Sequence, residues 1–125
     1  MILGTGIDIC EVARIEQSIA RFGEQFLRRV FTEQEIRYCQ SKKNSVERYA
    51  ARFAAKEAAM KALGTGWAHG VVWKSVEVGR EPRGRPTLLL HGKAAELAKE
   101  MGVTRVSLSL THTETSAMAF VVLEG

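Results

Sequence analysis

An acidic and a basic side chain spaced four residues apart, Glu57 and Lys61, are the clearest sign of chemistry in this sequence of 125 residues. They lie in an alanine-rich run, residues 52–64, whose composition predicts one strong helix. Residues four apart on a helix are neighbours, and Phe53 lies one turn earlier on the same line. Two interpretations follow: a carboxylate and a cation in a partly enclosed site, or an ordinary surface ion pair worth about 0.3–0.5 kcal/mol.

A second carboxylate, Asp8, lies inside an apolar and β-branched stretch, residues 2–10, that predicts the first strand. A charge there is costly unless it is paired or binds a metal. Alternatively, Asp8 lies on the polar side of the strand and faces solvent between Ile7 and Ile9. Two carboxylates that come together repel, and Mg²⁺ relieves this repulsion by taking one or two carboxylates together with phosphate oxygens and water. Asp8 and Glu57 are therefore candidate magnesium ligands.

Basic side chains elsewhere in the chain would suit the phosphates of such a ligand. Arg52 and Lys56 lie on the predicted helix, and Arg83 and Arg85 lie in a proline- and glycine-containing turn between two predicted strands. His112 ends a later strand, a position that carries function more often than the middle of a strand does. A lone histidine at a strand end is nevertheless more often a solvated residue.

Arg14, Arg21 and Arg28 recur every seven residues, which on a continuous helix would make a basic stripe, although Gly23 interrupts it. By charge pattern alone the stripe is a solvated helix face, and the functional alternative is a docking surface for an acidic partner. The net charge of +4, from 18 Lys and Arg against 14 Asp and Glu, favours an acidic partner. It does not choose among nucleic acid, a phosphate-bearing cofactor and an acidic protein.

The hydrophobic periodicity predicts one domain spanning residues 1–125, of the α+β class, with a mostly antiparallel sheet packed against a long central helix and shorter helices. The predicted strands are residues 2–10, 71–78, 87–91, 106–110 and 116–123. Helices are predicted at residues 12–22, 44–64 and 93–101, with a short helical turn near residues 26–30. A further helix is predicted to begin at the capping box of residues 32–35.

Other features of the composition indicate a cytoplasmic protein. No apolar run approaches the roughly 20 residues that a membrane span needs, and the first residues carry no basic segment of a secretory signal. The two cysteines, Cys10 and Cys39, have neither disulfide nor zinc spacing, which suits a reducing compartment.

Four segments in this order resemble the motifs of the small bacterial 4′-phosphopantetheinyl transferases. The helix motif is the most specific of them, and the resemblance spans essentially the whole chain. In one departure, Thr111 stands where the family commonly has serine, which leaves a hydroxyl in place. The segments are Gly6-Ile7-Asp8-Ile9, residues 53–62, Gly84-Arg85-Pro86 and residues 107–113.

The resemblance implies an enzyme that transfers the 4′-phosphopantetheine arm of coenzyme A to a serine of apo-acyl carrier protein, releases adenosine 3′,5′-bisphosphate and supports fatty acid biosynthesis. By the family's pattern the catalytic residues are Asp8 and Glu57, which bind Mg²⁺, and Lys61, which stabilises or protonates the leaving phosphate. The implied coenzyme A site consists of Arg52, Lys61, Gly64, Pro86, Thr111 and His112.

The resemblance also implies protein partners. Acyl carrier proteins are acidic helical bundles, so Arg14, Arg21 and Arg28 become the expected docking surface. The resemblance implies a homotrimer with active sites between subunits. His112 is then expected to lie in the same active site as Asp8 and Glu57 of a neighbouring subunit. Two alternatives remain: a nucleic-acid-binding domain, although only nine aromatic residues occur and most fall at core spacing, and a purely structural trimer module.

Overall fold

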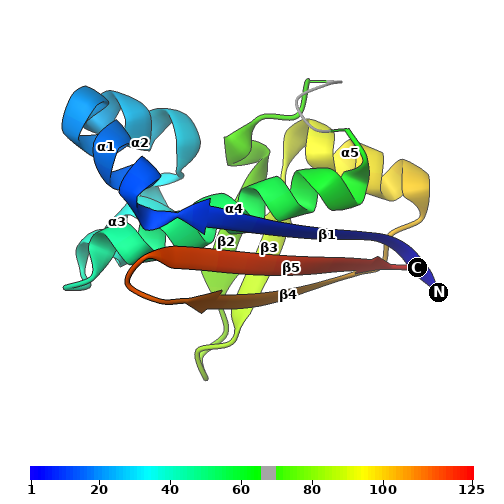
Figure 1. Ribbon diagram of the computed structural model, residues 1–125. Coiled ribbons are helices and arrows are strands. Elements are labelled where there is room, and N and C mark those ends of the chain that lie inside the picture. The colour runs from blue at the N-terminus through cyan, green and yellow to red at the C-terminus, as the bar shows by residue number, and fades with distance from the viewer. Residues whose placement is uncertain (66–69) are drawn as a thin grey trace.

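The computed structural model of the chain describes residues 1–65 and 70–125. Helices occupy most of the first half, and four of the five strands within the described residues lie in the second (Figure 1). The elements are β1 (Ile2–Glu11), α1 (Val12–Phe22), α2 (Glu24–Val30), α3 (Glu33–Gln40), α4 (Ser45–Leu63), the 3₁₀ helix η2 (Trp73–Ser75), β2 (Val76–Arg80), β3 (Pro86–Leu90), α5 (Gly92–Met101), β4 (Arg105–His112) and β5 (Ser116–Glu124).

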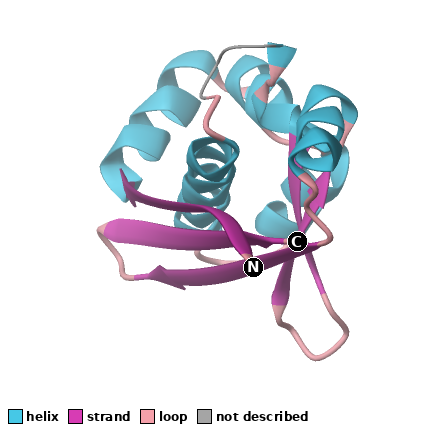
Figure 2. Ribbon diagram, turned by 90° about the vertical axis from the view of Figure 1, so that its right-hand side faces the viewer, coloured by secondary structure: helices cyan, strands magenta, loops and turns pink. Residues whose placement is uncertain are grey.

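The strands form two antiparallel sheets rather than one. β1, β5 and β4 pair in that order, so that the first and last strands of the chain are neighbours, while β2 and β3 form a separate hairpin. The hairpin lies beside the edge strand β4 and crosses it at a steep angle (Figures 1 and 2). The predicted α+β class and the antiparallel pairing are confirmed, and the division into two sheets is the detail that periodicity did not reveal.

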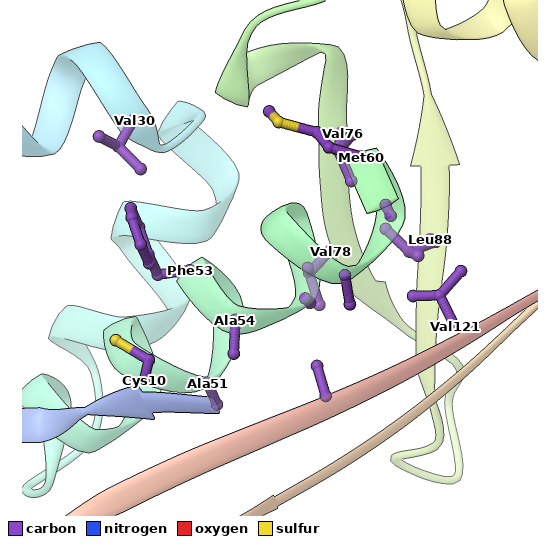
Figure 3. Packing of buried hydrophobic residues seen from close by; sticks show 14 of the residues in the cluster. Cys10, Val30, Ala51, Phe53, Ala54, Met60, Val76, Val78, Leu88 and Val121 are labelled. Carbon is purple, nitrogen blue, oxygen red and sulfur yellow. The ribbon is translucent and has the colours of Figure 1, made fainter. Parts of the chain in front are cut away.

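The central helix α4 lies along one face of the three-stranded sheet, and the described helices all lie on that side (Figures 1 and 2). Its contact face is mostly alanine, and Figure 3 shows Ala51 and Ala54 facing the strands while Phe53 points toward α2. Short side chains let the helix and the sheet approach closely. None of the helices within the two described ranges is both long and apolar enough to cross a membrane.

Two glycines of β1 set how closely this strand approaches α4. A Cβ atom at Gly6 would lie 1.8 Å from the carbonyl oxygen of Ala58, and one at Gly4 would lie 2.3 Å from that of Ala62. These clashes involve helix backbone, which cannot move aside as a flexible side chain can. Glycine at both positions therefore lets the strand lie directly against the helix, with Asp8 two residues further along.

The opposite face of the sheet carries exposed apolar side chains. Ile7 lies opposite Phe120 in the strand register and Ile9 lies opposite Met118. Ile7 is 55% exposed and Phe120 43% exposed. We refer to these exposed side chains on the open face as the apolar patch; patches of this kind are typical of interaction surfaces.

Most element boundaries follow local signals, with two differences. Thr32 and Glu35 form the predicted capping box, in which the Glu35 carboxylate accepts from the Thr32 backbone N–H at 2.8 Å. The predicted strand 71–78 is instead η2 followed by β2, because the Ser75 hydroxyl accepts a hydrogen bond from the Val72 N–H and folds the chain into a turn. Asn44 lies at the N-cap of α4 as predicted, but its side chain accepts from Arg48 rather than capping the helix.

A fully buried ion pair joins α3, α4 and β2. Lys56 Nζ lies 2.8 Å from Glu35 Oε1, and neither side chain is exposed. The lysine also donates to the carbonyls of Trp73 and Val76, and Glu35 accepts from the Val78 N–H. Burial lowers the pKa of Lys56, while Glu35 opposes that shift. The expectation that Lys56 would suit a ligand phosphate is therefore wrong, since its ammonium is enclosed and already satisfied.

Replacing Lys56 by methionine should destabilise the protein by about 3–5 kcal/mol, because it leaves the Glu35 carboxylate buried without its counter-ion. Urea unfolding followed by circular dichroism, at one fixed protein concentration, measures this loss. Lys93→Met is the matched control: Lys93 is exposed and only loosely paired with Glu96 at 3.7 Å, so the expected cost is below about 1 kcal/mol. Equal costs for the two variants would contradict a stabilising role for the buried pair.

Candidate functional site

The side chain of Asp8 lies on the face of β1 that packs against α4. Side chains alternate along a strand, and here Gly6 and Cys10 are buried against the helix while Ile7 and Ile9 are exposed on the open face. Asp8 shares the inner face with the two buried residues and is only partly exposed. The alternative in which Asp8 faces solvent between the two isoleucines is wrong, because the isoleucines are the residues that face outward.

Lys61 contacts Asp8 rather than forming a simple pair along the helix. Its ammonium donates to Asp8 Oδ1 at 3.0 Å and to the backbone carbonyl of Ile7 at 2.9 Å. The Lys61 side chain is more than half exposed, so this pair adds little to stability. Its consequence is positional: an amine from α4 is held against a carboxylate from β1, across 53 residues of sequence.

Glu57 is the second carboxylate at this position. Burial raises the pKa of Glu57, and the nearby charge of Asp8 raises it further, while Lys61 and Arg14 act in the opposite direction. Two carboxylates and an amine thus interact electrostatically where β1 meets α4, and we refer to Asp8, Glu57 and Lys61 as the carboxylate cluster. A partly desolvated pair of carboxylates of this kind favours a divalent cation, which would neutralise both. Within the described ranges no group of three or more His, Cys, Asp and Glu side chains is placed to hold a metal.

A small cavity of about 180 Å³ lies at the other end of α4, and we refer to it as the basic cavity. Arg52 is only 2% exposed, and its Nε atom is buried without a hydrogen-bond partner among the described residues. A buried N–H of a guanidinium without a partner is costly, so a bound anion would satisfy it. The cavity is lined by Arg48, Ala51, Arg52, Arg80, Pro86, Leu110 and His112.

His112 enters the basic cavity from the end of β4 and is held by Glu47. The Nδ1 atom of the imidazole lies 3.1 Å from Glu47 Oε1, and both side chains are mostly buried. Glu47 leaves only Nε2 of His112 open to another partner. Sequence reasoning missed this contact, because Glu47 and His112 are 65 residues apart and no local pattern links them.

Two arginines of the basic cavity were also missed. Arg48 lies one helical turn before Arg52, and this spacing was a signal that could have found it. Arg80 had no such signal, because it ends β2 and reaches the cavity only through the way the hairpin packs beside α4.

The six residues expected to contact coenzyme A do not meet at one place in a single chain. Arg52, Pro86 and His112 line the basic cavity together. Gly64 ends α4 twelve residues beyond Arg52, about 18 Å along the helix axis. Thr111 is exposed on the open face of the sheet, opposite to His112. The sixth is the lysine of the carboxylate cluster.

The three spaced arginines do not form one continuous stripe. Gly23 adopts a positive φ of 55° and ends α1, so Arg14 and Arg21 lie on α1 while Arg28 lies on α2. All three are exposed. Arg28 already pairs with two glutamates at 3.0 and 3.7 Å, which leaves the two α1 arginines as the freer part of this surface.

Comparisons with known proteins place the chain in a family. Residues 4–121 match the family model described as the 4′-phosphopantetheinyl transferase superfamily. A holo-[acyl-carrier-protein] synthase of Koribacter versatilis (strain Ellin345) is 66% identical over 124 residues, 99% of each chain. The crystal structure of holo-[acyl-carrier-protein] synthase from Neisseria meningitidis is similar with a TM-score of 0.91 and 36% identity, over 100% of both chains. That from Helicobacter pylori, in complex with coenzyme A, has a TM-score of 0.82 and 32% identity, over 96% of this chain and 99% of that one. The chain belongs to the 4′-phosphopantetheinyl transferase superfamily.

Proposed function

We propose that this chain is an enzyme that transfers the 4′-phosphopantetheine moiety of coenzyme A to a serine of apo-acyl carrier protein. The names of its relatives and the coenzyme A in a related structure support this substrate pair. The observation that carries the proposal is the carboxylate cluster, in which Asp8 and Glu57 interact beside an amine. The reaction belongs to fatty acid biosynthesis in the cytoplasm, and the chain acts as one domain.

In this reaction the serine oxygen attacks the phosphorus that carries the pantetheine arm. The bond from that phosphorus to the bridging oxygen of the pyrophosphate breaks, and adenosine 3′,5′-bisphosphate departs. The serine hydroxyl passes its proton to a water molecule oriented by a carboxylate of the cluster. Lys61 is suited to the charge that develops on the leaving phosphate. An ammonium has three donors, and Lys61 uses two of them on Asp8 and on the Ile7 carbonyl, which leaves one for the substrate.

Asp8 and Glu57 fit a magnesium site by the chemistry of their donors. Both offer carboxylate oxygens, which a hard cation prefers, and the raised pKa of Glu57 reflects a negative charge that its surroundings disfavour. Mg²⁺, when bound, would neutralise the pyrophosphate and the leaving nucleotide. The two residues would hold the ion, and phosphate oxygens and water would fill its remaining positions.

The basic cavity is the proposed site for phosphate at the nucleotide end of coenzyme A. Arg48, Arg52 and Arg80 supply guanidinium groups that can bind phosphate through paired hydrogen bonds. The buried Nε of Arg52 is the strongest support, since a phosphate oxygen would give it the partner it lacks. Nε2 of His112 adds a further donor from β4 in the protonated form of the ring, since Nδ1 is held by Glu47.

We also propose that the enzyme is a homotrimer with active sites between subunits. The carboxylate cluster and the basic cavity lie at different places in one chain, and a neighbouring subunit would bring one of each together. The apolar patch on the open face of the sheet is the surface that such an assembly would bury.

A transfer assay read by mass spectrometry tests the function. Apo-acyl carrier protein incubated with the enzyme, coenzyme A and Mg²⁺ should gain the mass of one phosphopantetheine, and EDTA should abolish the gain. Glu57→Gln should slow transfer by about 100-fold or more, because it removes a ligand of the ion. An unmodified carrier would contradict the function, and undiminished transfer in EDTA would contradict the magnesium site.

At neutral pH and without ligand, the Glu57→Gln variant should be at least as stable to unfolding as the wild type. The folded-state pKa of Glu57 is raised, so its ionised form disfavours folding, and a neutral amide relieves this. The difference in the free energy of unfolding between the variant and the wild type should shrink as the pH falls through that pKa, because the wild-type carboxyl then binds its proton more readily in the folded state. Thermal unfolding in EDTA measures it, with Glu100→Gln on the exposed side of α5 as the control for both readouts.

Phe120→Arg should convert the trimer to monomers and abolish transfer, because it places a charge within the apolar patch. Sedimentation velocity measures the assembly. Leu89→Arg is the matched control, since Leu89 is also exposed, at 54% against 43% for Phe120, but lies on β3 and not on the open face of the larger sheet. A Phe120→Arg variant that remains trimeric would place the subunit interface elsewhere.

Arg21→Glu should raise the KM for the carrier protein by about tenfold at low salt, because it reverses a charge on the docking surface. The effect should fade at high salt while kcat at saturating carrier stays unchanged. Lys99→Glu on α5 carries the same charge change at a distant exposed site and should leave KM alone. Arg14 is less suitable, since its charge also acts on Glu57. A KM that Arg21→Glu leaves unchanged would contradict docking on α1.

A further inference from the structure

One aromatic ring contacts cations from three parts of the chain. Over the ring of Tyr38 lie the guanidinium carbon of Arg52, 4.2 Å from the ring centroid, that of Arg80 at 5.1 Å, and the ammonium of Lys42 at 5.2 Å. Tyr38 belongs to α3, Arg52 to α4 and Arg80 to the end of β2, and Figure 1 shows these three elements meeting near the N-terminal end of α4. Two of the three cations line the basic cavity.

The Tyr38 ring attracts the two arginines as a carboxylate otherwise would. Guanidinium groups that share one ring repel each other, and among the described residues neither Arg52 nor Arg80 forms an ion pair with an acidic side chain. The negative face of an aromatic ring attracts cations without accepting their in-plane N–H groups. The ring therefore holds both arginines without occupying their donors. Arg52 Nη1 donates to the Arg48 carbonyl at 3.5 Å, and its buried Nε has no partner among the described residues.

We propose that Tyr38 is a positioning residue of the coenzyme A site, which orients Arg52 and Arg80 toward an incoming phosphate. This inference rests on the proposed function of the basic cavity. An acidic residue in the same place would neutralise the arginines and weaken their binding of an anion. The uncharged ring instead holds them in position and leaves their positive charge unchanged. The cavity thus keeps its positive charge in a partly buried setting.

The alternative is that Tyr38 only fills space between α3 and α4. The two roles differ in what they require of the side chain. Packing requires apolar volume, whereas positioning requires the face of an aromatic ring. The hydroxyl should matter to neither role, since no hydrogen bond to it occurs among the described residues.

Two substitutions separate these roles. Tyr38→Phe keeps the ring, and Tyr38→Leu keeps apolar bulk without it. In the otherwise intact enzyme, Tyr38→Leu should weaken coenzyme A binding about tenfold, measured by isothermal titration calorimetry, and Tyr38→Phe should stay within about twofold of the wild type. The KM for coenzyme A should follow the same order, while kcat and the KM for the carrier protein stay unchanged. Lys42→Met is the control, because Lys42 touches the ring but does not line the cavity.

Coenzyme A binding by Tyr38→Leu as tight as that of the wild type would overturn the proposal. Equal losses in Tyr38→Phe and Tyr38→Leu would overturn it too, because the ring would then not be the feature that matters. If Tyr38→Leu fails to fold, Tyr38→Met provides another apolar side chain without a ring, and the same comparison with Tyr38→Phe applies. A wild-type enzyme that fails to bind coenzyme A would contradict the proposed function instead, so the two failures remain distinct.

Discussion

The direct contact between β1 and α4 is the constraint on which the rest of the structure depends. Gly6 brings the strand against the carbonyl of Ala58, where any side chain would collide with helix backbone. This closeness lets an aspartate of the strand and the acid and amine of the helix interact, although more than forty residues of chain separate them. The exposed apolar face on the other side of the sheet follows from the same arrangement, since the described helices all lie on one side.

Three charged side chains of α4 that are buried or partly buried meet three different environments. Lys56 and Glu35 are fully buried and satisfy one another and nearby backbone groups. Glu57, the next residue on the helix, is only partly buried and is repelled by Asp8. Arg52 is buried but lies against an aromatic ring instead of an acid. Only the Lys56–Glu35 pair has all its charges compensated within the chain. Glu57 and Arg52 would each gain a partner from a ligand, and they account for the chemistry that we propose.

Much of the fold and part of the site followed from local patterns. The capping box at Thr32, the end of α1 before Gly23 and the long helix were predicted at nearly their observed bounds, because each depends on residues within a turn or two. Asp8 was proposed because it is a charge inside an apolar strand, and Glu57 because it lies four residues before Lys61 on the predicted helix; the family resemblance implied the same two carboxylates. Arg80 was not found, because nothing near it in the sequence records that the hairpin packs beside α4.

The different environments of Lys56 and Glu57 show what the sequence alone determined and what the tertiary structure decided. Their presence on a helix was evident from composition and spacing, because helix formation depends on neighbouring residues. Successive residues on a helix point about 100° apart, so these two neighbours could not share an environment. Which one would be enclosed and which would meet Asp8 depended on the side from which the sheet approaches. That side is set by contacts between segments far apart in the chain, and only the folded structure contains them.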